Sequence, residues 1–291
     1  MRDFVYVAPT SIEDAIGELC RGEARPLAGG TDLLPQLREG RRRADRIVDL
    51  KRIPALSAIG HLPRGGIEIG AALSATHVAR HAAISNYPAI AAAALLLGSV
   101  QIQNRATLGG NVCNAAPSAD VVPALICHAA AADIAGANGR RQVALEELFL
   151  GPGKTVLSPD EVLISLSLAP VPPRSATTYL RFTPRREMDI AIAGVAVRID
   201  LAEDRSIAFA RVALASVGPT PLRAVPAERV LQGNRPDPAL AREAALAAAG
   251  AARPISDTRA SADYRRALVE VLTQRALAAS ARALNLAWEP L

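Results

Sequence analysis

Aromatic side chains are scarce in this 291-residue sequence, in which only 3% of the residues are Phe, Trp or Tyr. Proteins that bind nucleic acids usually combine basic clusters with aromatic rings on which bases stack. The net charge of +5 comes mostly from scattered Lys and Arg residues, with short basic clusters at residues 41–43 and 185–186. The sequence therefore argues against a nucleic-acid-binding protein.

Cysteine is also rare, and Cys20, Cys113 and Cys127 form no CxxC pair. An odd number of cysteines argues against a disulfide framework. Because an iron–sulfur cluster normally takes four thiolate ligands, we do not expect this chain to hold one by itself. His77 and His81 stand four residues apart on a predicted helix, but the sequence offers them no third ligand, so we expect no metal site.

Long apolar runs are missing as well. The longest of them, such as residues 90–97, are far shorter than the ~20 residues that a membrane-spanning helix needs. The first residues lack the basic and apolar pattern of a secretion signal and read like a strand instead. Together with the unpaired cysteines, these features predict a soluble, cytoplasmic protein.

Two glycine-rich stretches stand out against this background: PLAGGTDLL at residues 26–34 and TLGGNVCNAAPSAD at residues 107–120. Adjacent glycines permit a positive φ and let a ligand approach the main chain, so that N–H groups can bind an anion such as a diphosphate. Thr31 or Asp32 could also cap a following helix. An ordinary surface loop is the alternative for either stretch alone. The pair predicts two loops that hold one ligand from opposite sides.

The order of predicted strands and helices divides the chain into two domains. The first covers residues 1–172, with subdomains over about residues 1–55 and residues 56–172. The prolines of residues 170–173 break all periodicity and suit a linker. The second domain, residues 175–285, combines strands of an antiparallel sheet with helices that carry apolar stripes.

Individual elements follow from the same patterns. In the first domain we expect a helix at residues 33–38, a strand at residues 56–60, and loops at residues 107–120 and 148–154. In the second domain we expect strands at residues 177–182, 190–201 and 207–216, and helices at residues 226–231, 238–251 and 261–285.

Three motifs occur in an order that is more specific than any of them alone. They are AGGTD at residues 28–32, TLGGN at residues 107–111 with PSAD at residues 117–120, and YLRFTPRREMDIA at residues 179–191. Together they resemble the FAD-binding medium subunit of molybdenum hydroxylases, the family of carbon monoxide dehydrogenase and xanthine dehydrogenase flavoproteins. The resemblance runs from residue 1 to about residue 280.

The resemblance implies both a fold and a function. The fold would be α+β, with a two-part FAD-binding domain of the PCMH and vanillyl-alcohol-oxidase type followed by a C-terminal domain like that of the CO dehydrogenase flavoprotein. The chain would be the flavoprotein subunit of an oxidoreductase complex, a heterotrimer. A large subunit would hold molybdopterin, a small subunit would hold 2Fe–2S clusters, and the FAD of this chain would pass electrons to an external acceptor.

The resemblance also implies which residues bind FAD. They are Leu27, Ala28, Gly29, Gly30, Thr31, Asp32, Leu33 and Leu34 in a first glycine segment (residues 27–34), Thr107, Gly109, Gly110, Asn111 and Asn114 in a second glycine segment (residues 107–114), and Asp120, Leu163 and Arg181. Asp120 would bind ribose hydroxyls of the adenosine half. Leu163 would contact the flavin or adenine ring. Arg181, where members often carry a lysine, would lie near the isoalloxazine and stabilise its anionic reduced form.

We expect no catalytic side chain in this chain, because a flavin performs its own electron chemistry and needs the protein for binding and tuning. Main-chain donors of residues 29–32 would hold the diphosphate, and those of Gly110 and Asn111 would close on it from the other side. No GxSxG nucleophile motif is present, and Cys113 has no evident base. We interpret Cys113 as a small space-filling side chain, with a reactive thiol as the alternative.

Two other classes of protein stay open from the residues. A stand-alone FAD-dependent oxidase of the vanillyl-alcohol-oxidase type would share a similar FAD domain, although the scarcity of aromatic residues disfavours its substrate pocket. A non-catalytic nucleotide-binding or scaffold protein would show no yellow colour and no redox response.

Overall fold

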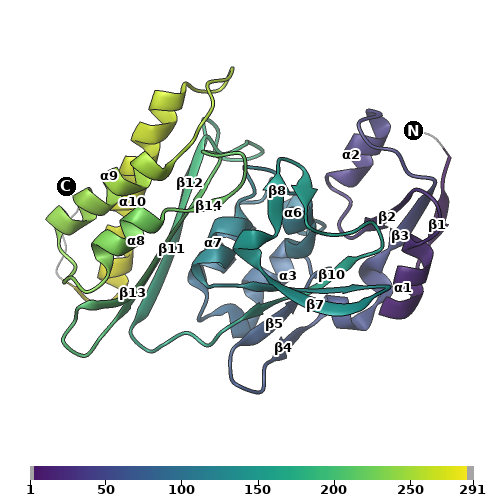
Figure 1. Cartoon of the computed structure of the whole chain (residues 1–291), viewed down its shortest axis with the longest axis horizontal. Helices are drawn as coiled ribbons and strands as arrows, with labels where there is room; N and C mark the ends of the chain where they lie inside the picture. The colour runs from purple at the N-terminus through teal and green to yellow at the C-terminus, as the bar shows by residue number, and fades with distance from the viewer. Residues whose placement is uncertain (1–2, 287–291) are drawn as a thin grey trace.

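Three larger β-sheets follow one another along the chain (Figure 1), and a two-stranded sheet of β8 (Phe149–Gly151) and β9 (Lys154–Thr155) is added to them. This computed structural model describes residues 3–286. The first sheet is parallel, with the strand order β1 (Val5–Val7), β3 (Arg46–Asp49) and β2 (Ala24–Leu27). Its strands are connected by α1 (Ile12–Leu19) and α2 (Leu33–Arg38), the second with the predicted bounds. The Ser11 hydroxyl caps α1 by accepting the N–H of Asp14.

The second sheet is antiparallel and brings distant parts of the chain together. Its strands, in spatial order, are β4 (Ile59–His61), β5 (Ile67–Gly70), β10 (Val162–Leu168), β6 (Ala131–Gly136) and β7 (Gly139–Ala144). Five helices lie between β5 and β6 in the sequence: α3 (Ala75–Arg80), α4 (Pro88–Leu95), α5 (Val100–Gln103), α6 (Leu108–Cys113) and α7 (Val121–Cys127). The late strand β10 occupies the centre, so the sheet forms only when residues 59–70 meet residues 162–168.

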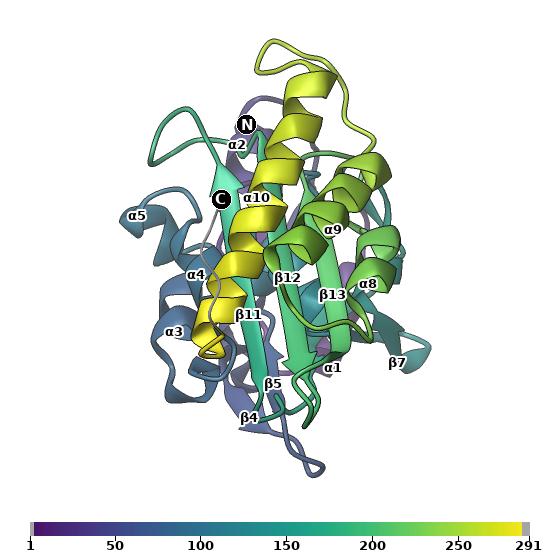
Figure 2. The ribbon, with the colours of Figure 1, turned by 90° about the vertical axis from the view of Figure 1, so that its left-hand side faces the viewer.

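The third sheet is antiparallel and follows chain order. It consists of β11 (Ser175–Phe182), β12 (Ala193–Leu201), β13 (Ile207–Ala215) and β14 (Leu222–Arg223). One face is covered by α8 (Val225–Leu231), α9 (Pro238–Ala251) and α10 (Ala262–Ala283), as Figure 2 shows. The other face packs against α7 and α4. With helices on both faces, every residue of β12 except Leu201 is buried.

The hydrophobic core continues from the second sheet into the third. All seven residues of α7 are buried, and the largest cluster joins this helix to Tyr179, Ala196 and Ala213 of the third sheet. A contiguous apolar interface of this kind fixes the two parts relative to each other. The start of α7, where Asp120 stands, therefore lies next to this interface.

Three sequence predictions in the first part of the chain are wrong. Residues 54–57 form the 3₁₀ helix η2 (Pro54–Ser57), started by Pro54, so the strand begins only at Ile59. Residues 149–155 form the hairpin of β8 (Phe149–Gly151) and β9 (Lys154–Thr155) rather than a loop, because Gly153 takes the positive φ that the turn needs. Part of the predicted loop at residues 107–120 is α6, since Thr107 caps a helix there.

Two further short 3₁₀ helices, η3 (Ala82–Ile84) and η4 (Leu145–Glu147), join longer elements of the second part. Throughout residues 3–286, no helix combines the length and the apolar character that a bilayer crossing requires.

Candidate functional site

The backbone of the first glycine segment packs against residues 105–106, directly before the second glycine segment. A Cβ atom built on Gly29 would lie 2.1 Å from the carbonyl oxygen of Arg105 and 2.9 Å from the Cα of Ala106, so only glycine fits. Further along, Gln36 Nε2 donates a hydrogen bond of 3.2 Å to Asn114 Oδ1. The first segment and the helix that follows it are thus attached to both ends of the second segment.

The first segment is an open turn between β2 and α2. Gly30 has φ +76°, a value that favours glycine. Among residues 3–286, no acceptor receives a hydrogen bond from the N–H groups of residues 29–32. Asp32 occupies the N-cap position of α2 without capping it, so that prediction is wrong for Asp32: its backbone is helical rather than extended. Burial raises the pKa of Asp32 above its usual range, and the charge of Arg42 opposes this effect.

The second segment is mostly helix. Thr107 caps α6: its Oγ1 accepts the N–H of Gly110 at 2.9 Å, and its carbonyl oxygen accepts the N–H of Asn111 at 3.0 Å. The prediction that these two N–H groups face a diphosphate is therefore wrong, because the first helical turn already uses both. The side-chain Oδ1 of Asn111, by contrast, is buried without a hydrogen-bond partner among the described residues.

The adjacent glycines of the second segment face different surroundings. A Cβ on Gly109 would lie 2.5 Å from both the Cβ and the carbonyl oxygen of Ala71, at the end of β5. A Cβ on Gly110 would meet only Thr107 Oγ1, at 2.8 Å. Gly109 therefore allows α6 to pack on the second sheet. Gly110 leaves the side of α6 next to Thr107 without a side chain, so that a ligand can approach it there.

Replacing Thr107 by Val should lower the free energy of unfolding by ~0.5–2 kcal/mol, the range measured for lost N-caps. The physical reason is that the N–H of Gly110 loses the hydroxyl that accepts it at 2.9 Å. Chemical denaturation of the purified protein measures the change. Thr107→Ser is the control, since it keeps the hydroxyl, and an equal loss in both variants would speak against the cap.

A buried ion pair joins the two parts of the chain beside α7. Asp120 Oδ2 accepts a 2.5 Å bond from Arg181 Nη1, and Asp120 Oδ1 accepts a 2.7 Å bond from the Tyr179 hydroxyl. The side chains of Arg181 and Asp120 are only 5% and 9% exposed. Burial raises the pKa of Asp120, and the charge of Arg181 and the bond from Tyr179 oppose that rise.

This pair constrains two predicted roles. The resemblance places Asp120 at the adenosine ribose and Arg181 at the isoalloxazine, which lie at opposite ends of an extended FAD. Since the two side chains are in contact, both roles cannot hold for a cofactor in that form. Tyr179 is a member of this cluster that the sequence analysis missed. Its position two residues before Arg181 on a strand is the signal, because residues i and i+2 share one face.

Four other residues that the sequence analysis singled out take no part in this ion pair. Leu163 is 3% exposed and belongs to the main hydrophobic cluster. Burial raises the pKa of Cys113 to about 12, so its sulfur stays a thiol at neutral pH and the reactive-thiol alternative loses support. His77 and His81 stack with ring centroids 6.0 Å apart, and the described residues contain no group of three side chains suited to a metal ion.

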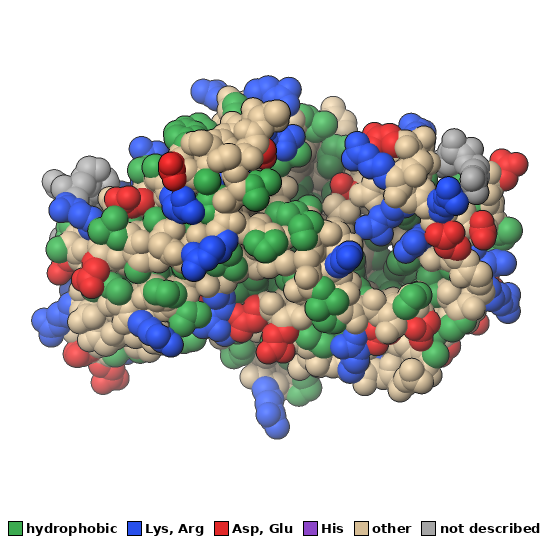
Figure 3. Space-filling view, turned by 45° about the horizontal axis from the view of Figure 1, so that its top comes forward, with side chains coloured by type: hydrophobic (Ala, Val, Ile, Leu, Met, Phe, Trp, Pro, Cys, Tyr) green, Lys and Arg blue, Asp and Glu red, His purple; other side chains and the backbone are tan. Residues whose placement is uncertain are grey.

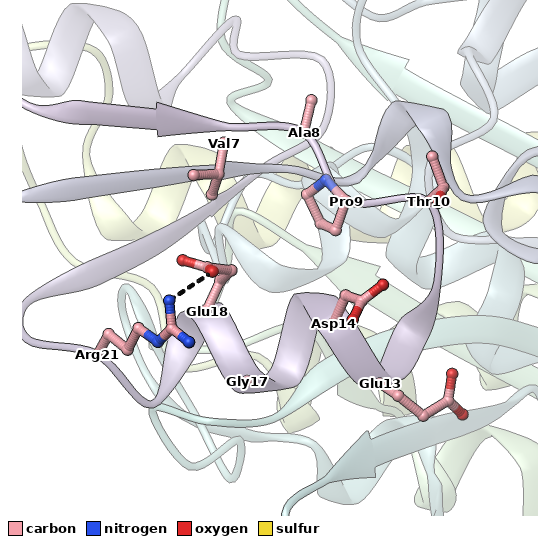
Figure 4. Close-up of a pocket in the computed structure, with 9 residues that line it drawn as sticks. All are labelled: Val7, Ala8, Pro9, Thr10, Glu13, Asp14, Gly17, Glu18 and Arg21. Carbon is pink, nitrogen blue, oxygen red and sulfur yellow. Dashed lines mark hydrogen bonds and ion pairs between the residues drawn. The ribbon is translucent and has the colours of Figure 1, made fainter.

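Two cavities lie outside the glycine segments. One, of about 430 Å³, is bounded by residues 7–10 and by side chains of α1, among which Glu18 pairs with Arg21 (Figure 4). The other, of about 70 Å³, lies at the β6–β7 turn.

Figure 3 shows a hollow in the surface between the part of the molecule that carries α2 and the part that carries the third sheet.

Comparison with known proteins identifies the family. The family described as "FAD binding domain in molybdopterin dehydrogenase" matches residues 2–171, which is more than half of the chain. The chain belongs to this family. The CO dehydrogenase flavoprotein C-terminal domain matches residues 178–280 of the same flavoprotein subunit. The predicted family, the α+β two-domain fold and the oxidoreductase class are thereby confirmed.

Relatives of this flavoprotein subunit align over nearly its whole length. It is 34% identical to the carbon monoxide dehydrogenase medium chain of Afipia carboxidovorans, covering 97% of this chain and 98% of the relative. It is 32% identical to the xanthine dehydrogenase FAD-binding subunit of Escherichia coli O157:H7, covering 95% and 96%. Among solved structures, carbon monoxide dehydrogenase from Hydrogenophaga pseudoflava matches with a TM-score of 0.92 and 31% identity, covering 97% and 98%.

Proposed function

We propose that this chain binds FAD between its two glycine segments and serves as the electron-delivering subunit of a multi-subunit molybdenum hydroxylase. The observation that carries the location of the site is the backbone contact of Gly29 with Arg105 and Ala106, which brings two segments from distant parts of the sequence together. When bound, FAD supplies the electron-transfer chemistry. The chain supplies the groups that hold and orient it.

The residues of the two segments suit a dinucleotide. The N–H groups of residues 29–32 have no acceptor within the described chain, and a row of such donors favours a diphosphate. On the opposite side, Gly110 keeps the surface of α6 flat, and the unpartnered Oδ1 of Asn111 offers a buried acceptor for a hydroxyl or amide of the ligand. We retain Leu163, Asp120 and Arg181 as further cofactor-binding candidates.

The family and the number of cysteines indicate which subunit of the complex holds which cofactor. The relatives are named as medium chains or FAD-binding subunits, and we propose a large molybdopterin subunit and a small 2Fe–2S subunit as partners. Cys20, Cys113 and Cys127 are all free. Three thiols are fewer than one cluster normally needs, so we assign the iron–sulfur centres to a partner. This flavin would pass the electrons on to an external acceptor.

Two further features belong to the proposal. We propose domain limits of 1–172 and 175–285, which are supported by the start of the third sheet at Ser175. We also propose a cytoplasmic location, which the free cysteines support because disulfides are rare in reducing compartments. A stand-alone oxidase of the vanillyl-alcohol-oxidase type is less favoured, since the family and its medium-chain relatives are parts of larger enzymes.

Purification from the native host tests this function. We expect the chain to elute with a larger molybdopterin protein and a smaller 2Fe–2S protein, with one FAD for each copy of this chain. Mass spectrometry of the eluted proteins and the flavin and iron–sulfur absorbance measure this composition. A single yellow protein that oxidises a substrate without partners would contradict the subunit assignment, and a colourless complex would contradict the cofactor.

A further inference from the structure

Lys51 contacts the first glycine segment from outside the three motifs. It follows β3 and belongs to the 3₁₀ helix η1 (Leu50–Arg52). Its ammonium group donates a 3.0 Å hydrogen bond to the carbonyl oxygen of Ala28, directly before the glycine pair. The same ammonium group donates a 2.6 Å bond to Asp49 Oδ1. Lys51 thus joins the end of β3 to the turn that follows β2.

Asp49 holds the Lys51 side chain in place. Its Oδ1 also accepts the backbone N–H of Lys51 at 3.0 Å, and its Oδ2 accepts the hydroxyl of Tyr6 on β1 at 2.5 Å. The Asp49 side chain is 8% exposed. Burial alone would raise the pKa of Asp49, but the bonds from Lys51 and Tyr6 outweigh it, and the net shift is downward. The carboxylate is therefore charged at neutral pH and fixes a cation beneath the turn.

The position of the Ala28 carbonyl decides where the next N–H points. In a trans peptide, the C=O of one residue and the N–H of the next point in opposite directions. Because Lys51 holds the carbonyl of Ala28 on the β3 side, the N–H of Gly29 faces away from β3. Gly29 is the first residue of the stretch 29–32, whose N–H groups have no acceptor within residues 3–286.

We propose that Lys51 is a positioning residue for FAD: by holding the Ala28 carbonyl, it orients the free N–H groups of the first glycine segment towards the diphosphate. This inference rests on the proposed function. In this proposal, Lys51 contacts the carbonyl oxygen of Ala28 and does not touch the cofactor itself.

Titration of the flavin-depleted complex with FAD tests the inference. We expect Lys51→Met to weaken FAD binding by about 10- to 100-fold, the loss typical of a hydrogen bond from a charged donor. Lys51→Arg should recover part of this loss, because a guanidinium keeps the charge and a donor. The matched control is Arg52→Met, which removes the neighbouring, exposed cation and should bind FAD like the wild type.

Hydrogen exchange adds a readout that loss of global stability would not reproduce. In Lys51→Met saturated with FAD, we expect faster amide exchange than in the wild type, confined to residues 27–34. Tyr6→Phe, which removes only the exposed phenol's bond to Asp49, should shift both readouts less and in the same direction. FAD affinity unchanged in Lys51→Met, or lowered equally in Arg52→Met, would overturn the positioning role. A wild-type complex that does not bind FAD would instead overturn the proposed function.

Discussion

Gly110→Val should strip most of the FAD from the purified complex while the chain remains folded. A Cβ built at this position lies 2.8 Å from Thr107 Oγ1, which has to shift, and meets no other side chain within 4 Å. If FAD lies between the segments, the added methyl groups occupy its space. Forced overlap costs ~1–3 kcal/mol, so we expect FAD affinity to fall by about tenfold or more. The ratio of flavin to protein absorbance after purification measures the loss.

Two control variants separate the overlap of the new side chain with FAD from the loss of the helix cap and from a loss of stability. Thr107→Val removes the same cap that the Gly110→Val substitution would disturb, but adds nothing at position 110, so Gly110→Val should lose more FAD than Thr107→Val does. Gly109→Ala forces a Cβ to within 2.5 Å of Ala71 and should instead lower the melting temperature of the chain. Full flavin content in Gly110→Val would contradict a cofactor on this side of α6.

The second large effect concerns the buried ion pair. Arg181→Met should lower the free energy of unfolding by ~3–5 kcal/mol, because it leaves the Asp120 carboxylate buried without its cation. Tyr179 still donates one hydrogen bond, but a phenol does not neutralise the charge. Denaturant-induced unfolding of the purified chain measures the change. The same loss is expected at any ionic strength, since buried pairs are screened little by salt.

A double variant and an exposed pair serve as controls. Asp120→Asn combined with Arg181→Met removes both charges and should recover much of the lost stability. Arg174 faces Glu203 at 3.9 Å on the surface, so Arg174→Met should cost ~1 kcal/mol or less. If Arg181→Met were no more destabilising than Arg174→Met, the ion pair would not be holding α7 against β11.

Local signals were sufficient for much of the fold. The bounds of α9 were predicted correctly because Asp237 caps the helix and Pro238 occupies its first turn, and both act within a few residues. A strand at residues 190–201 was predicted from alternation, and the structure contains β12 there, although it starts only at Ala193. In each case the determining contacts lie close in sequence or follow directly from periodicity.

The site depended on contacts that no local pattern contains. Gly109 and Gly110 are neighbours with the same chemistry, and only the approach of Ala71 from another part of the chain separates their roles. The glycine pair was therefore predictable from the sequence, but the partners of its N–H groups were not. Asp120 and Arg181 were likewise both predicted as site residues, 61 positions apart, without their mutual contact.

An experimental structure of the FAD-loaded complex tests the central claim most directly. The account predicts that the diphosphate lies within hydrogen-bond distance of the N–H groups of residues 29–32, with Gly110 facing it from α6. Loaded FAD that contacts only one of the two glycine segments, or that lies in the cavity beside α1, would contradict it.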